Sequence, residues 1–265
     1  MKLEKHSYKR FFSGKNPIQR KCVVCHMDYL GYKDLIENDT TGGLLQRLYS
    51  VYNDLLQQIK KSSTASEMFS VRTFSDNVLI ACPIDTDDGE TEFGLVIGLV
   101  SMFQREMAEH GYFFRGAIEI GDLHMSEDMI FGKALVDAYQ LETTKARFPR
   151  IVIGPALKEQ LRIWNAAYAP NENPAHRALL CFQDGLWFVN YLFNHYLDVE
   201  VARQDSITRH KFQIEAKIAR EKRSEVREKY YWSAHYHNHF CQTHGLQPLV
   251  LGGKVLQFHA LSFKP

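Results

Sequence analysis

The chain has 265 residues, and its 32 lysines and arginines nearly balance 31 aspartates and glutamates, which gives a formal net charge of +1. Its hydrophobic fraction of 45% is ordinary for a globular protein and excludes a disordered or collagen-like chain. The near-neutral charge argues against nucleic-acid binding through bulk positive charge, and no apolar run approaches the roughly 20 residues that span a bilayer. The basic N-terminus lacks the apolar core of a secretory signal, so we expect a cytoplasmic protein without a membrane or nucleic-acid partner.

Hydrophobic periodicity predicts alternating strands and helices over the first part of the chain. The stretch before residue 21 is basic and polar, which favours a loosely held arm. The pattern then predicts, in chain order, a strand at 21–28, a helix at 44–59, strands at 67–73 and 77–84, a helix at 95–111, a strand at 112–121, a helix at 133–146 and a strand at 151–153. This order is typical of an α/β (α+β) protein, a ferredoxin-type sandwich in which helices cover one face of an antiparallel-rich sheet.

The character of the sequence changes after Gly154. The pattern predicts a helix at 155–164, a loop at 170–174, a hairpin at 179–192 and one long helix at 206–239. We interpret the charged middle of that helix as a solvated face with i,i+4 ion pairs. The expected domains are an arm at 1–17, an α/β domain at 18–155 and a C-terminal hairpin and helical extension at 156–265.

Two clusters invite a metal or redox interpretation. Cys22 and Cys25 form a C-x-x-C motif, but positions three apart face opposite sides of a strand and no second pair follows. His235 and His239 share one helix face, which is acceptable zinc geometry. Interleaved aromatic residues favour packing for this stretch, which also contains His237, Cys241 and His244. The basic helix at 207–229 is a candidate for RNA or DNA binding, but its glutamates offset much of the charge.

Asp28 and Asp76 are the strongest candidates for chemistry. Each lies at a strand end, and the two carboxylates converge if the hairpin around Asp76 lies beside the first strand. Converging oxygen ligands suit Mg²⁺ or Mn²⁺, with substrate phosphates completing the coordination. The alternative is that both are ordinary turn residues.

At these residues the sequence resembles the class III nucleotidyl cyclases. The resemblance covers about residues 20–160, and the similar motifs are Asp28-Tyr29-Leu30-Gly31-Tyr32, Arg72-Thr73-Phe74-Ser75-Asp76, Arg115 through Gly121, Gly132 and Leu141-Glu142. It implies that Asp28, Asp76 and the carbonyl of Tyr29 hold two Mn²⁺ or Mg²⁺ ions, so that no protein nucleophile is needed. It also implies a homodimer, with substrate contacts from Arg72, Tyr29, Gly31, Tyr32 and Arg115.

The sequence departs from the family at the positions that recognise purines. Arg72 replaces the lysine of adenylyl cyclases, and Met129, next to Asp128, takes the second base-reading position. The transition-state asparagine and arginine of the family fall on Val136 and Gln140, and a one-residue shift gives Asp137 and Leu141. Positive charge could come instead from Arg115, Lys145, Arg147 or Arg150.

Loss of the purine-reading residues with retention of the metal residues resembles the pyrimidine cyclases of the bacterial Pycsar antiphage system. The resemblance implies metal-dependent cyclisation of UTP or CTP to its 3′,5′-cyclic monophosphate and pyrophosphate, with an effector that responds to the product rather than binding the protein. Two alternatives stay open. One is a catalytically inactive cyclase-like nucleotide-binding or scaffold protein, and the other is a nucleic-acid-processing relative that uses the same two-carboxylate site.

Overall fold

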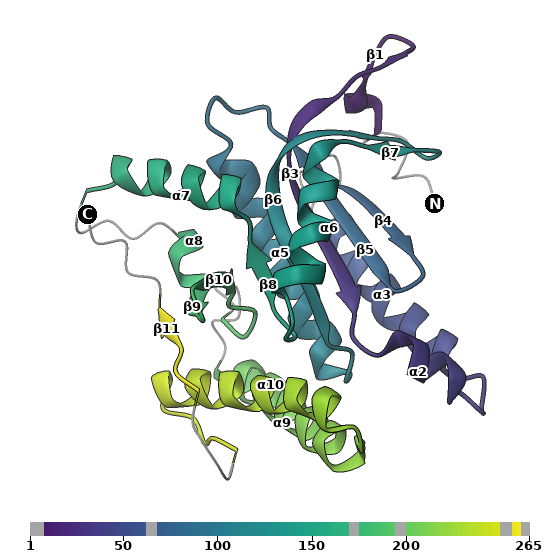
Figure 1. The fold of residues 1–265 in the computed structure, drawn as a ribbon, viewed down its shortest axis with the longest axis vertical. Helices are drawn as coiled ribbons and strands as arrows, with labels where there is room; N and C mark the ends of the chain where they lie inside the picture. The colour runs from purple at the N-terminus through teal and green to yellow at the C-terminus, as the bar shows by residue number, and fades with distance from the viewer. Residues whose placement is uncertain (1–7, 62–67, 170–174, 194–199, 250–255, 261–265) are drawn as a thin grey trace.

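The computed structural model describes residues 8–61, 68–169, 175–193, 200–249 and 256–260. One large sheet runs through the molecule, with its strands in the order β11–β9–β10–β8–β6–β3–β5–β4 and with β7 paired to β6 (Figure 1). All described neighbours are antiparallel except β6 and β8, which are parallel. This arrangement confirms the predicted mixed α/β class and its antiparallel-rich sheet. The strands are β3 (Arg20–Tyr29), β4 (Ser70–Phe74), β5 (Asn77–Pro83), β6 (Phe114–Met125), β7 (Ile130–Phe131), β8 (Ile151–Ile153), β9 (Leu180–Gln183), β10 (Leu186–Val189) and β11 (His259–Ala260).

Helices pack against both faces of the central strands. The main core joins α3 (Leu44–Lys61) and α5 (Glu90–Glu109) to alternate residues of β3 such as Val23 and Cys25. On the other face, α6 (Lys133–Lys145) lies in front of the sheet in Figure 1 and contributes Ala134 to a smaller core with Val24. The prediction placed helices on one face only. Which face α6 covers depends on the path of the chain between β7 and α6, which the hydrophobic pattern does not indicate. Further helices are α2 (Tyr32–Glu37), α7 (Pro155–Ala167) and α8 (Ala175–Ala178).

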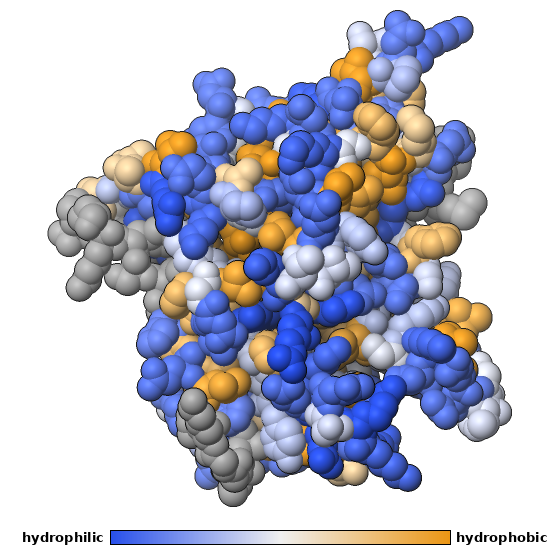
Figure 2. Space-filling model, viewed as in Figure 1, coloured by the Kyte–Doolittle hydropathy of each residue, from blue (hydrophilic) through white to orange (hydrophobic). Residues whose placement is uncertain are grey.

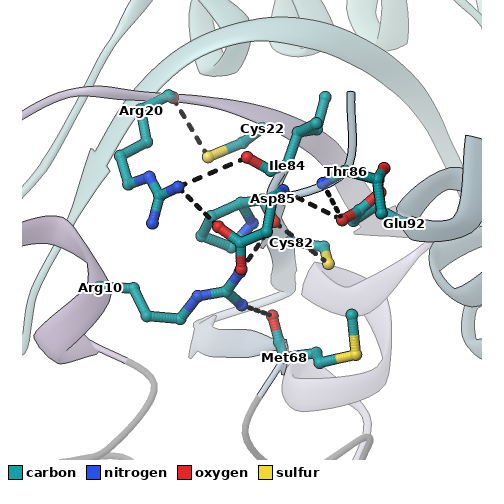
Figure 3. Close-up of polar contacts among 10 residues, drawn as sticks. Arg10, Arg20, Cys22, Met68, Cys82, Ile84, Asp85, Thr86 and Glu92 are labelled. Atoms are coloured by element: carbon teal, nitrogen blue, oxygen red, sulfur yellow. Dashed lines mark hydrogen bonds and ion pairs between the residues drawn. The ribbon is translucent and has the colours of Figure 1, made fainter. Parts of the chain in front are cut away.

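The N-terminal arm is anchored to the sheet rather than loosely held in its described part. After η1 (Lys9–Phe11), a small hairpin forms from β1 (Phe12–Ser13) and β2 (Asn16–Pro17). Phe11 is fully buried in the smaller core. Arg10 donates to the carbonyls of Met68 and Pro83, both at 3.0 Å, and pairs with Asp85, which also binds Arg20 at 2.6 Å (Figure 3). The basic residues that suggested a solvated arm therefore attach it to the loop after β5.

The predicted C-terminal hairpin is present and extends the same sheet. Strands β9 and β10 turn at Asp184 and Gly185, whose φ angles of 55° and 75° suit a tight two-residue turn. Phe188 of β10 pairs with Val152 of β8, so residues from the extension continue the sheet of the 18–155 region. The loop predicted at 170–174 lies outside the described residues.

The single long helix predicted at 206–239 is wrong. The structure has two helices, α9 (Glu200–Arg220) and α10 (Ser224–Thr243), which pack side by side beneath the sheet in Figure 1. The break occurs where Glu221 accepts hydrogen bonds from the backbone and guanidinium of Arg223, both at distances near 3 Å. A run of charged residues is compatible with a continuous helix and does not indicate where the chain turns back. The position of the turn depends on these contacts.

Buried packing explains the aromatic and histidine-rich stretch of α10. Trp232 and Tyr236 stack on each other, and both meet the ring of Phe188 edge-on. His237 Nδ1 lies 3.0 Å from His210 Nδ1 on α9, and burial lowers the pKa of His237 to about 4. Within the described ranges, no group of three or more His, Cys, Asp or Glu residues is arranged to hold a metal.

The five cysteines are all free and buried. Cys22 belongs to the smaller core and Cys25 to the main core, so the two thiols of the C-x-x-C motif face opposite sides of β3. Burial raises the pKa of Cys22 to about 12, which disfavours the thiolate that redox or metal chemistry needs. In the described part of the chain, no helix is long and apolar enough to cross a membrane.

Candidate functional site

The backbone of the sheet brings Asp28 and Asp76 together. Asp28 is the penultimate residue of β3 and pairs with Asn77, the first residue of β5. The N–H of Tyr29 donates to the carbonyl of Asp76 at 2.9 Å, so the turn before β5 is tied to the end of β3. The convergence expected from the sequence therefore follows from the antiparallel pairing of β3 with β5.

The two carboxylates affect each other. Burial is the main cause of the raised pKa of Asp28, and the negative charge and hydrogen bonding of Asp76 raise it further. Arg115 opposes this effect by stabilising the ionised form. The pKa of Asp28 therefore reflects mainly its burial, and the smaller effect of Asp76 shows that the two carboxylates lie close enough to interact.

Arg115 links Asp28 to a third acid, Glu142 of α6. Arg115 Nε and Nη2 each lie 3.0 Å from Asp28 Oδ2, and Nη2 also lies 2.9 Å from Glu142 Oε1. Glu142 is only 2% exposed, and burial raises its pKa to about 7, with smaller contributions from Asp28 and Asp76. Arg115 thus forms ion pairs with both Asp28 and Glu142, and Asp76 lies close to these two acids.

The loop after β3 depends on a glycine. Gly31 has φ +82° and immediately precedes α2, and a Cβ built there would meet no atom within 4 Å. The residue is therefore required for its left-handed backbone rather than for close packing. Tyr29 is buried and its ring lies 6.0 Å from the ring of Tyr32, the first residue of α2. Both tyrosines belong to the core that supports the loop.

Arg72, the predicted base-reading residue, faces the turn that joins β6 to β7. Its Nη1 donates to the carbonyl of Ser126 at 3.3 Å and also to that of Glu127. The structure therefore brings Arg72 of β4 to the same turn as Met129, which is 51% exposed. Two of the residues predicted to face a base thus lie on neighbouring segments.

The two residues that the resemblance predicted at transition-state positions are exposed on α6. Val136 is 52% exposed, and Gln140 is exposed as well. Asp137 pairs with Lys133 on the same helix. In the shifted alignment, Asp137 is therefore already paired, and Leu141 is an apolar residue packed against the main core.

The four candidate sources of positive charge differ in their surroundings. Arg150 is buried, donates to Gln183 Oε1 at 2.6 Å and pairs with Asp184 at 3.3 Å, so it serves the core near Trp232. Lys145 is exposed. Arg147 is exposed and pairs with Glu228 of α10. Arg115 is the candidate that contacts Asp28 directly.

Sequence reasoning missed two residues at this site. Glu142 lies in the Leu141-Glu142 motif, for which the sequence predicted no role at the site. Lys229 stood in the charged stretch interpreted as solvated, although it is half-buried and its electrostatic neighbours include Asp28 and Arg115. Only the packing of α10 against the end of the sheet reveals Lys229, and no local pattern marks it.

The acids present fit a divalent cation in part. Asp28 and Asp76 are hard oxygen donors whose charges are close together, and the carbonyl of Tyr29 lies in the same segment. Two carboxylates are fewer than the ligands Mg²⁺ or Mn²⁺ requires, so water or substrate phosphates would complete the shell. The donor set is therefore suited to a cation shared with a phosphorylated ligand.

Comparisons with known proteins give structural matches alone. No protein-family model and no curated protein match the chain. Among solved structures, it is similar to the adenylyl cyclase CyaB from P. aeruginosa, with 15% identity, a TM-score of 0.43 and coverage of 64% of this chain and 94% of that chain. It is also similar to the monomeric guanylyl cyclase domain of the RhoGC fusion protein from the aquatic fungus Blastocladiella emersonii, with 14% identity, a TM-score of 0.47 and coverage of 64% and 95%.

A third similar structure is the adenylate/guanylate cyclase/hydrolase from Silicibacter pomeroyi, with 19% identity, a TM-score of 0.43 and coverage of 64% of this chain and 97% of that chain. At these identities and TM-scores the matches establish no shared activity. A functional assignment must therefore stand on the site residues themselves.

Proposed function

We propose that the protein is a metal-dependent nucleotidyl cyclase that converts a pyrimidine nucleoside triphosphate, UTP or CTP, to its 3′,5′-cyclic monophosphate and pyrophosphate. The observation that carries the proposal is the pair of mutually interacting carboxylates, Asp28 and Asp76, held together by backbone pairing at the end of β3. The motif resemblance around both residues supports the same chemistry.

The chain's own residues would act by binding and orientation. Asp28 and Asp76, with the Tyr29 carbonyl, would hold the cation and so place the α-phosphate near the ribose 3′-hydroxyl. A divalent cation bound there would neutralise phosphate charge and favour ionisation of that hydroxyl. Arg115 would stabilise charge on the phosphates, since its guanidinium already lies between two acids that a cation would partly neutralise.

Base selection is assigned to Arg72 and the β6–β7 turn. A guanidinium has five N–H donors in a planar fork, and the two turn carbonyls use only part of that capacity. The remaining donors suit the carbonyl and ring-nitrogen acceptors of a pyrimidine edge. Met129 beside it offers apolar contact rather than a carboxylate or amide for a purine.

The proposed assembly is a cytoplasmic homodimer. Met129, Phe131, Val136 and Tyr139 are each more than half exposed on β7, the preceding turn and α6. Figure 2 shows hydrophobic surface over this end of the molecule. Large exposed apolar patches are typical of interaction surfaces.

We propose that the cyclic product, as a messenger in antiphage defence, reaches its effector by diffusion.

One observation favours a second candidate function. The exposed Val136 and Gln140 leave α6 without the polar pair that the resembling enzymes use in the transition state. A protein with intact metal ligands but no such pair would bind a nucleoside triphosphate without turning it over.

The decisive experiment incubates the purified protein with Mn²⁺ and separately with ATP, GTP, CTP and UTP, and identifies products by mass spectrometry. Cyclic UMP or cyclic CMP is expected from the wild type. Asp76→Asn should abolish it, while Asp205→Asn, which changes an exposed acid on α9, should not. Four reactions without a cyclic product would refute the cyclase, and triphosphate binding without turnover would then support the second candidate.

A further inference from the structure

The N-terminal half of α10 is held against the segment that carries the first aspartate. Figure 1 shows α10 beneath the end of the sheet where β3 finishes, close to α2. The ring of Tyr230 lies 5.6 Å from that of Phe113, whose carbonyl accepts a hydrogen bond from the N–H of Leu30 at 2.9 Å. Arg223, just before α10, pairs with Asp34 of α2. The helix therefore has fixed contacts on both sides of the loop after Asp28.

These contacts fix Lys229 at the edge of the site. Its neighbour Tyr230 is buried at Phe113, and its other neighbour Glu228 pairs with Arg147. Lys229 is half-buried, and no ion pair involving it occurs among the residues the structure describes. A half-buried ammonium that forms no direct ion pair has lost hydration without full compensation, so it is a candidate for binding an external anion.

Three cations share this neighbourhood. The pKa of Lys229 is lowered, first by burial and then by the positive charges of Arg115 and Arg147, whereas Asp28 and Glu225 of the same helix act in the opposite direction. The nearby carboxylates offset this repulsion only in part, because the pKa of Lys229 remains lowered. Arg115 is engaged by Asp28 and Glu142, and Arg147 forms an exposed pair with Glu228. An exposed pair of that kind is weak and can be exchanged for a stronger anion.

We propose that Lys229 is a phosphate-binding residue of the candidate site, contributed by the C-terminal helix, and that it receives the phosphate chain of the nucleotide together with Arg115 and Arg147. This inference rests on the proposed function for the identity of the ligand. It places part of the site outside the 18–155 region and supplies positive charge that Val136 and Gln140 cannot. Lysine suits this role because it is a compact point charge for phosphate oxygens.

Binding of inorganic tripolyphosphate in the presence of Mg²⁺, measured by calorimetry at near-physiological salt, tests the proposal without a base or a reaction. Lys229→Ala should weaken binding about tenfold or more, the usual effect of losing a charge-assisted hydrogen bond. Lys229→Arg should stay within a few-fold of the wild type because it keeps the charge. Lys222→Ala is the matched control, since it removes an exposed lysine from the turn before the same helix and should leave binding unchanged.

Thermal unfolding of each variant separates binding from folding. Lys229→Ala should keep a midpoint close to that of the wild type, because burial and the charges of Arg115 and Arg147 oppose the ammonium more than Asp28 and Glu225 favour it. Equal binding by the wild type and Lys229→Ala, or no binding of tripolyphosphate by the wild type, would overturn the role of Lys229. Turnover of UTP and CTP, measured on the same preparations, tests the cyclase activity separately. If there is no turnover but Lys229→Ala binds tripolyphosphate tenfold more weakly, the phosphate-binding role of Lys229 is supported and the cyclase is not.

Discussion

Replacing Glu142 by glutamine should make the protein more stable at alkaline pH and leave it nearly unchanged at acidic pH. Burial raises the pKa of Glu142 from an ordinary 4.5 to about 7 in the folded protein. Because the folded-state value is the higher one, its contribution to stability is fully present below about pH 4.5 and is lost as the pH rises through 7. Glutamine has the shape of the neutral acid and carries no charge, so it mimics the protonated side chain at every pH.

The size of the effect follows from the same values. At about 1.4 kcal/mol per pH unit, the interval from 4.5 to about 7 corresponds to about 3 kcal/mol of unfolding free energy. For a chain of this size that is a difference in melting temperature of about 6–12 °C. Urea unfolding at pH 5 and pH 8 would measure it, with Glu159→Gln, an exposed acid on α7, as the control. If Glu142→Gln changes the free energy of unfolding equally at both pH values, the reasoning is refuted. Ionisation of Glu142 would then not affect the stability of the folded protein.

Two glycines give further predictions. Gly154→Ala should lower the free energy of unfolding by about 2 kcal/mol in a urea titration, because the new Cβ would lie 2.1 Å from Glu119 Oε2, and that carboxylate accepts from the Leu157 N–H at 2.8 Å. Gly94→Ala in α5 is its control and should stabilise by up to about 1 kcal/mol, since nothing lies within 4 Å of that Cβ. Gly31→Ala should cost about 1–2 kcal/mol through its φ of +82° alone, measured by thermal melting, and an unchanged midpoint would contradict the left-handed backbone.

The central sheet was predictable because its strands carry strong local patterns. The run from Cys22 to Met27 is almost continuously apolar, as expected for a strand covered on both faces. The turn between β4 and β5 lies at Ser75 and Asp76, polar residues that precede the apolar run of β5. Asp76 lies beside Asp28 because β5 pairs with β3, the condition on which the predicted convergence depended. The sequence therefore indicated both strand ends, whereas the approach of the two carboxylates depended on the pairing of β3 with β5.

Residues that depend on long-range packing were not predictable in the same way. The break between α9 and α10 is formed by Glu221 and Arg223, and Arg223 also reaches Asp34, which is 189 residues away in the chain. Charged residues in succession suit a continuous helix as well as a turn, so composition alone does not choose between them. The position of Lys229 was not predictable for the same reason, because it depends on how α9 and α10 pack against the sheet. Phe11 shows the converse, because an apparently polar arm is anchored by one buried ring.

The charge of the whole chain conceals the charge of the site. The formal total of +1 argues against a polyanionic partner, and the described site repeats that near-balance on a smaller scale, with Asp28, Asp76 and Glu142 facing Arg115 and Lys229. The balance within the site is uneven in space, because Asp28 and Asp76 lie at the ends of the strands and Glu142 on α6, while the second cation comes from α10. A ligand that carries both signs, a phosphate chain together with a divalent cation, would complement both parts at once. Such a ligand should therefore bind more tightly as a complex than either component alone, and this coupling is a property that neither the total charge nor any single motif would have indicated.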